Sequence, residues 1–305
     1  MSEVTKVMEQ ENKRLLKANR RAKIADRLMT GVFYAIALFF FGLLAAFATY
    51  VIVGGFMHAK LSMFAFSPRD AIGNQLFNTL YLVFLALLFC VPIGIFAGIY
   101  LAIYAKGGWL SKFIRICMET LSSLPSIVVG LFGYLMYLMV FGMNKSLLAG
   151  SLSVSILILP LITTTTEDAI KGLPEGFFQA SIGMGSTKWQ AVWHVLLPAC
   201  VSRIMTGIIL AAGRGFGEAA CLLYTTGSGT IIRWDNWDIT SPTSPLNPLR
   251  PAETLSLQIW DLQINGQNPH LASLASAVLM ILVLTFSITA NTWSRRIAKK
   301  KQGQL

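Results

Sequence analysis

Charged residues are scarce in this sequence. Asp, Glu, Lys and Arg make up only 13% of its 305 residues, whereas a soluble domain carries about 25%. Hydrophobic residues make up 54%, and the mean hydropathy is +0.61. This composition excludes an ordinary soluble globular domain and predicts a chain that lies within a membrane.

Residues that bind metals, form disulfides or hydrolyse nucleotides are also few. The four cysteines form no C-x-x-C pair, and His58, His194 and His270 lie far apart in the sequence. Neither a disulfide framework nor a zinc site is therefore expected. The sequence has no G-x-x-x-x-G-K-[S/T] motif, so we do not expect this chain to hydrolyse ATP itself. We assign no catalytic residue, no metal and no cofactor, which disfavours a membrane enzyme.

Acidic residues are fewer than basic ones. The sequence has 14 Asp and Glu and 25 Lys and Arg, so its net charge is +11. The basic residues gather before the first apolar run, after the last, and in the two loops that hold Lys112 and Lys188. With an even number of spans these groups share one side, which the positive-inside rule makes cytoplasmic. Both termini are therefore predicted to be cytoplasmic. Because the charge lies at helix ends, no nucleic-acid binding is expected.

Six apolar runs are long enough to cross a bilayer as helices, which takes about 20 residues each. They cover roughly 31–54, 76–104, 113–142, 147–166, 203–226 and 271–293. The period-2 alternation of a barrel strand is absent, so helices are the predicted form. The run 113–142 contains Pro125 and is predicted to have a break. The predicted fold class is an all-α polytopic membrane protein with about six transmembrane helices.

Two flanking segments and one long loop complete the predicted organisation. Residues 1–30 are basic and form either a helix on the membrane surface or a solvated tail, while residues 294–305 form a basic tail. Within the proline-rich loop 227–270, residues 252–262 are predicted to form a short amphipathic helix at the outer surface. The loop also holds three tryptophans, which serve either as interfacial anchors or as a docking surface for an external binding protein: Trp234, Trp237 and Trp260.

Ionisable residues occur inside two of the predicted spans. Arg214 and Glu218 are four residues apart, which places both on one helix face. Glu167 follows the run of four threonines 163–166. A charge within the bilayer costs at least about 2.5–3.5 kcal/mol, so it persists when it is paired or faces a polar cavity. Arg214 is therefore either half of a salt bridge with Glu167 or Glu218, or an anion-binding group, since guanidinium binds oxyanions with two parallel hydrogen bonds.

The loop between the fourth and fifth spans carries the most informative motif, QASIGMGSTKWQAVWHVLLP. Three residues separate its QAS from Gly185, and nine separate Gly185 from Val195. This spacing resembles the EAA loop of ABC importer permeases, which forms a cytoplasmic helix that docks on an ATPase subunit. Gln179 stands where the consensus has Glu. By this resemblance residues 175–198 form the coupling loop, with its coupling residues at Gln179, Ala180, Gly185, Lys188 and Pro198.

Three further motifs agree in order with one family. They read PIGIFAGIYLAIYAKGG from Pro92, LSSLPSIVVGLFGY from Leu121 and GRGFGEAACLLYTTG from Gly213. With the EAA-like loop they resemble the A-type permease subunit of the phosphate-specific (Pst) ABC importer. The resemblance implies a type I ABC importer transmembrane domain over residues 31–293. It also implies the cytoplasmic membrane as location, a second homologous permease, two ATPase subunits that bind ATP and Mg, and an extracytoplasmic phosphate-binding protein.

The same resemblance implies residues along the substrate path. Arg214 and Glu218 match the family's R-x-x-G-E motif, and Glu167 matches the glutamate that closes an R-x-x-E motif. Thr164 stands where that motif has arginine, so it supplies a hydroxyl but no charge. The implied cargo is inorganic phosphate; a related importer of sulfate, molybdate or tungstate is the alternative. A passive channel or scaffold is disfavoured, because it would not require the coupling loop.

Overall fold

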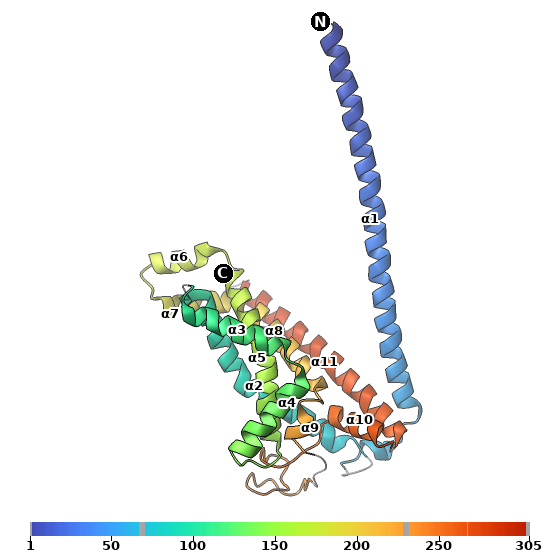
Figure 1. Ribbon diagram of the computed structural model, residues 1–305, viewed down its shortest axis with the longest axis vertical. Helices are drawn as coiled ribbons and strands as arrows, with labels where there is room; N and C mark the ends of the chain where they lie inside the picture. The colour runs from blue at the N-terminus through green and yellow to red at the C-terminus, as the bar shows by residue number, and fades with distance from the viewer. Residues whose placement is uncertain (1, 67–70, 106, 228–231, 267, 303–305) are drawn as a thin grey trace. The chain divides into compact units, whose positions relative to one another are not determined.

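The computed structural model describes residues 2–66, 71–105, 107–227, 232–266 and 268–302, and Figure 1 shows their helices. The described residues form helices, turns and loops but no strand. In the described part of the chain, five helices are long and apolar enough to cross a membrane, and a bent helix pair raises the number to six if the pair is one span. The predicted all-α class and the number of about six spans are therefore confirmed.

The chain divides into two compact units, Met1–Val51 and Ile52–Leu305. The first lies within helix α1 (Ser2–Met57), whose apolar part from Ala22 is a candidate span. Residues 2–30 continue into this span as one helix without a break. The reason is local, because residues 2–30 contain neither proline nor glycine to end a helix.

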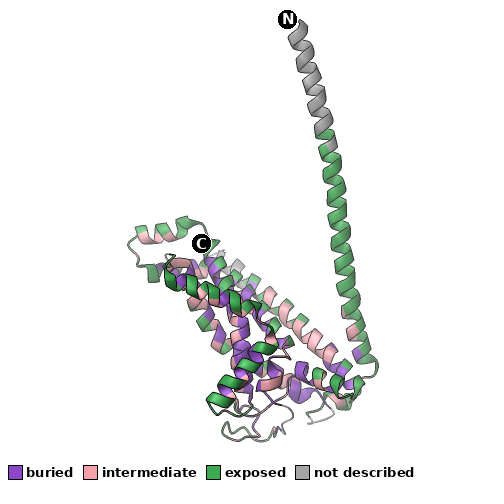
Figure 2. Ribbon diagram, in the orientation of Figure 1, coloured by how far each residue is buried: buried purple, intermediate pink, exposed green. Residues whose placement is uncertain are grey.

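Four long helices form the core of the second unit: α2 (Gly73–Ile99), α5 (Leu147–Lys171), α8 (Leu197–Gly217) and α11 (Pro269–Gln302). Helix α5 packs on both α2 and α8, and α11 packs on α8. Figure 2 shows buried residues along α5 and α2 in the interior of the unit. Their apolar side chains form one continuous cluster that includes Leu82, Val154, Leu157, Ile158 and Ala211.

Two glycines allow α2 to approach α5 closely. A Cβ atom on Gly94 would lie 2.7 Å from Cγ2 of Ile162, and one on Gly98 would lie 2.6 Å from Cβ of Thr166. Real Cβ atoms do not tolerate such distances, so the G-x-x-x-G spacing is needed for helix packing. A short π-helical segment (Tyr100–Tyr104) then ends this span.

The predicted break in the run 113–142 is confirmed. Helix α3 (Trp109–Ser123) and helix α4 (Ser126–Gly133), which a π-helical segment (Tyr134–Val140) extends, meet at an angle of 108°. Pro125 disfavours helical backbone at the residue before it, and Leu124 accordingly has an extended conformation, with φ −69° and ψ 135°.

The predicted span 203–226 is wrong at both ends. Helix α8 begins at Leu197 and ends at Gly217, and a separate short helix α9 (Leu222–Thr225) follows. Between them Glu218 is extended, with ψ 120°, and its Oε1 accepts a hydrogen bond from the backbone N–H of Cys221 at 3.0 Å. A glycine-rich segment has little helix propensity, and this side-chain bond stabilises the turn that replaces the helix.

The predicted helix at 252–262 is present as α10 (Leu255–Ile264). It is more buried than a helix at the outer surface would be, because Leu255 packs with Leu271 and Leu274 of α11 in a second apolar cluster. Figure 1 shows α10 at the end of the unit opposite α6 (Glu175–Gly183). Two histidines that lie far apart in the sequence also meet here, since the rings of His58 and His270 have centroids 4.4 Å apart and are tilted by 30° to each other.

A row of polar residues at the start of α2 holds the loop that precedes α10. Trp234 Nε1 donates to Asn74 Oδ1 at 3.0 Å, and Arg250 Nη2 donates to Asn78 Oδ1 at 2.6 Å. The N–H of Leu255 donates to Thr79 Oγ1 at 2.9 Å. Trp234 also packs edge-on against Phe66 and Phe77. Trp234 therefore anchors the loop to α2, in addition to any role that it has at a membrane interface.

Candidate functional site

Helix α5 carries one accessible stripe although it is otherwise deeply buried. Its exposed residues are Thr164, Asp168 and Lys171, and its half-buried residues include Leu152 and Ile156. The three exposed positions recur at intervals of three or four, so they share one helix face. This accessible stripe is polar and lies in the last two turns of α5.

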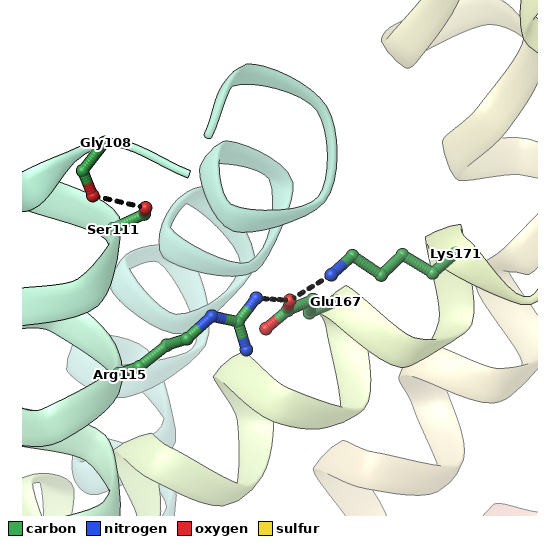
Figure 3. A network of polar contacts seen from close by, with 5 residues as sticks. All are labelled: Gly108, Ser111, Arg115, Glu167 and Lys171. Atoms are coloured by element: carbon green, nitrogen blue, oxygen red, sulfur yellow. Dashed lines mark hydrogen bonds and ion pairs between the residues drawn. The ribbon is translucent and has the colours of Figure 1, made fainter. Parts of the chain in front are cut away.

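Glu167 is the centre of a charge cluster beside this polar end (Figure 3). Its Oε1 accepts hydrogen bonds from Nη2 of Arg115 in α3 and from Nζ of Lys171, the latter at 2.7 Å. The Glu167 side chain is 6% exposed, whereas those of Arg115 and Lys171 are 47% and 49% exposed. One buried carboxylate thus holds two cations that remain accessible.

A cavity of about 360 Å³ lies between α3 and α5 at this cluster. It brings together two residues predicted from sequence, Thr164 and Glu167, and two that were not, Arg115 and Glu119. Thr164 Oγ1 donates to the carbonyl of Pro160 at 2.9 Å, so it offers the cavity an acceptor oxygen. The rest of the lining is Leu101, Met118, Ser122 and Ser123.

The other two predicted path residues lie apart from this cavity. Arg214 is exposed in the last turn of α8, and the described residues offer it no ion-pair partner. The expected shared face with Glu218 is wrong, because α8 ends between the two residues. Glu167 pairs with Arg115 and Lys171, so neither predicted salt bridge of Arg214 forms in this structure.

Arg115 is the main site residue that the sequence did not indicate. Its partner Glu167 is 52 residues away in the chain, and Arg115 lies among basic residues that were used to predict topology. The R-x-x-E spacing pointed to position 164 for a cation. In the structure the cation beside Glu167 is Arg115, which belongs to another helix. The spacing of residues within α5 cannot predict a partner from a different helix.

The segment 175–198, for which the motif predicts one cytoplasmic helix, forms a hairpin of two short helices. Helix α6 ends at Gly183, Gly185 makes the turn with φ +87°, and helix α7 (Lys188–Ala191) follows. The hydroxyls of Ser181 and Ser186 lie 2.7 Å apart across the turn.

The return to the core is equally well defined. Thr187 and Gln190 form a reciprocal capping box at the start of α7. A π-helical segment (Val192–Leu196) leads into α8, whose first turn contains Pro198. The predicted coupling residues Gln179, Ala180, Gly185 and Lys188 are exposed. The hairpin therefore presents a free surface at one end of the unit, where Figure 1 shows α6 and α7.

Residues 90–302 match the family described as the inner membrane component of binding-protein-dependent transport systems, and the chain belongs to this family. It is thus a membrane-embedded permease of the ABC importer class, in which the ATPase is a separate subunit.

Among known proteins, it is 39% identical over 287 residues to the probable ABC transporter permease protein YqgI of Bacillus subtilis, covering 91% of this chain and 98% of that protein. It is 38% identical over 164 residues to the phosphate transport system permease protein PstA of Yersinia pestis, covering 52% of this chain and 55% of that protein.

Solved structures show the same fold at low sequence identity. A bacterial alginate ABC transporter, in complex with a periplasmic protein bound to an alginate pentasaccharide, aligns with a TM-score of 0.62 and 18% identity, covering 90% of this chain and 96% of that one. The MetNI methionine ABC transporter in an inward-facing conformation aligns with a TM-score of 0.57 and 19% identity, covering 72% and 93%. The expected type I importer fold is therefore confirmed.

Proposed function

We propose that this chain is the permease subunit of an ATP-driven importer that carries inorganic phosphate across the cytoplasmic membrane. The observation that supports phosphate as the cargo is the 38% identity to PstA of Yersinia pestis over 164 residues. A second PstA, from Haemophilus influenzae, is 29% identical over 218 residues and extends the match to 70% of this chain. An importer of sulfate, molybdate or tungstate is the alternative.

Coupling to ATP hydrolysis is assigned to the α6–α7 hairpin. Its exposed surface, with Gln179 and Lys188, would dock on one of two separate ATPase subunits, which bind ATP and Mg. A second homologous permease would complete the membrane part, and an extracytoplasmic phosphate-binding protein would deliver the cargo. With both termini in the cytoplasm, α10 and the loop before it face that delivering protein.

The test is uptake by a reconstituted complex. The chain, its partner permease, its ATPase and its binding protein are placed in liposomes with ATP inside, and accumulation of labelled phosphate, sulfate and molybdate is measured. We expect ATP-dependent accumulation of phosphate alone. Accumulation of sulfate or molybdate in place of phosphate would establish the alternative cargo, and transport without ATP would refute the coupled mechanism.

A further inference from the structure

We infer that the cavity between α3 and α5 is a selectivity site for a protonated oxyanion, in which Arg115 binds the oxygens and Glu119 accepts a hydrogen bond from the oxyanion's hydroxyl. This inference rests on the proposed function and goes further, because it assigns to the permease itself a discrimination between hydrogen phosphate and fully ionised oxyanions.

The donor side of the cavity is the Arg115 guanidinium. Among the residues that the structure describes, only Glu167 binds this guanidinium, through Nη2, and Figure 3 shows the other terminal nitrogen without a partner among the residues drawn. Guanidinium has five N–H donors in a planar fork that matches two oxygens of an oxyanion. The side chain is 47% exposed, so the unused donors are accessible from the cavity.

The charge cluster allows Arg115 to break its ion pair with Glu167 without leaving that buried carboxylate uncompensated. Breaking a buried ion pair is costly when one charge is left uncompensated. Here Lys171 also binds Oε1 of Glu167, at 2.7 Å. An oxyanion can therefore take Arg115 in exchange for Glu167, and Lys171 continues to neutralise the carboxylate.

The acceptor side is Glu119, one helical turn beyond Arg115 in α3. It is exposed, lines the same cavity, and forms no ion pair with any residue that the structure describes. An ionised carboxylate only accepts hydrogen bonds. It therefore repels an oxyanion that has no proton and binds one that offers an O–H group.

Whether the cargo carries a proton decides how well this lining binds it. Inorganic phosphate keeps at least one proton at physiological pH, whereas sulfate, molybdate and tungstate keep none. A site built to hydrogen-bond a hydroxyl rejects an analogue that lacks it, because its polar group is left unpaired. A cavity lined only by cations would bind both kinds of anion, so Glu119 is the group that separates them.

A second cavity, which is apolar and has a volume of about 230 Å³, lies near the bend between α3 and α4. It is lined by Leu121 of α3, by Leu124 just after α3, by Phe132 of α4 and by Ile156 of α5. Ser122 and Ser123, which lie between Leu121 and Leu124 in the chain, line the polar cavity. Under the proposed topology the apolar cavity lies on the outer side of the polar one.

The experiment measures selectivity without the binding protein, which would otherwise select the cargo first. The purified permease–ATPase complex is titrated with labelled phosphate and labelled sulfate by equilibrium dialysis at pH 7. We expect the natural complex to prefer phosphate by about tenfold or more, as for one hydrogen bond to a charged group. We expect Glu119→Gln to lose most of that preference, because an amide donates to sulfate and removes the repulsion.

Two further variants isolate the cause. Asp168→Asn removes a carboxylate from the exposed face of α5 but outside the cavity lining, so its preference should match that of the natural complex. Arg115→Gln should weaken binding of both anions. A phosphate preference that survives Glu119→Gln, or equal binding of both anions by the natural complex, overturns the inference. Failure of the proposed function shows separately, as absence of ATP-dependent phosphate uptake in the reconstituted liposomes.

Discussion

Arg250 and Glu253 are ionisable residues in the loop before α10, and Arg250 is buried whereas Glu253 is half-buried. Arg250 is 1% exposed and donates to Asn78 Oδ1 at 2.6 Å and to the carbonyl of Pro245 at 3.2 Å. Burial lowers the pKa of its guanidinium to about 10, so it stays charged at neutral pH. Glu253 accepts a hydrogen bond from Gln75 Nε2 at 3.2 Å. Burial nevertheless raises the pKa of its carboxyl.

We expect the Glu253 carboxyl to make the protein less stable as the pH rises. Its pKa in the folded state lies above the value of 4.5 of an unperturbed carboxyl, so between those two values the folded state binds more protons than the unfolded state. The free energy of unfolding then falls with rising pH across this window. Glu253→Gln should remove that fall. Thermal unfolding of both proteins in detergent at pH 5 and pH 8 measures it; parallel pH dependence would contradict the assignment.

Arg214 is a predicted path residue on α8 that has no ion-pair partner among the described residues. We expect Arg214→Ala to reduce phosphate uptake per assembled complex about tenfold or more, as for a lost charged hydrogen bond. Arg214→Lys should restore uptake only in part, because an ammonium lacks the planar fork. Uptake is divided by the amount of complex recovered from the membrane. If Arg214→Ala lowers only that amount, the residue has a structural role and does not belong to the path.

The α6–α7 hairpin shows how one residue sets the shape of an element. Gly185 has φ +87°, and a Cβ there would meet no atom within 4 Å. The demand for glycine therefore comes from the backbone conformation and not from crowding. A left-handed conformation costs a residue with a side chain about 1–2 kcal/mol, and asparagine tolerates it best.

We expect Gly185→Val to abolish stimulated ATP hydrolysis while the chain stays inserted in the membrane, because a β-branched residue changes the turn between α6 and α7. Gly185→Asn is the matched control and should retain most of the coupling. ATPase activity of the reconstituted complex, with and without binding protein, is the measurement. Normal stimulation in the valine variant would disprove the coupling role of this hairpin.

A second expectation for α6 concerns Gln179, which stands where the coupling motif has glutamate. The side chain is exposed, so a charge there costs little desolvation. Gln179→Glu should therefore leave stimulated ATP hydrolysis unchanged. A large loss would mean that the partner ATPase is adapted to an uncharged side chain at this position.

The side of the membrane on which each terminus lies is decided at the scale of the whole molecule. Five helices of the described residues qualify as single spans, and the α3–α4 pair is either one bent span or a re-entrant segment. A bent span gives six crossings and places both termini on one side. A re-entrant segment gives five crossings and places them on opposite sides.

We expect both termini to be cytoplasmic, because basic residues flank the first and last spans. Cysteines introduced by Gln10→Cys or Gln302→Cys should therefore resist an impermeant thiol reagent added to intact cells. Ile239→Cys, in the loop before α10 and 60% exposed, should react and serves as the positive control. Labelling of one terminus alone would mean that α3 and α4 form a re-entrant segment.

Local chemistry is what the sequence by itself determined: the apolar runs, the bend before Pro125 and the turn at Gly185. Each depends on residues close together in the chain. The apolar runs follow from hydropathy, the bend from the restriction that proline places on the residue before it, and the turn from the left-handed backbone that glycine allows. Tertiary structure alone decided which charges meet. Glu167 pairs with Arg115 of another helix, and Glu218 leaves the face of Arg214 because α8 ends at Gly217. Ion pairs depend on distances in space, and helix packing sets those distances independently of spacing along the chain.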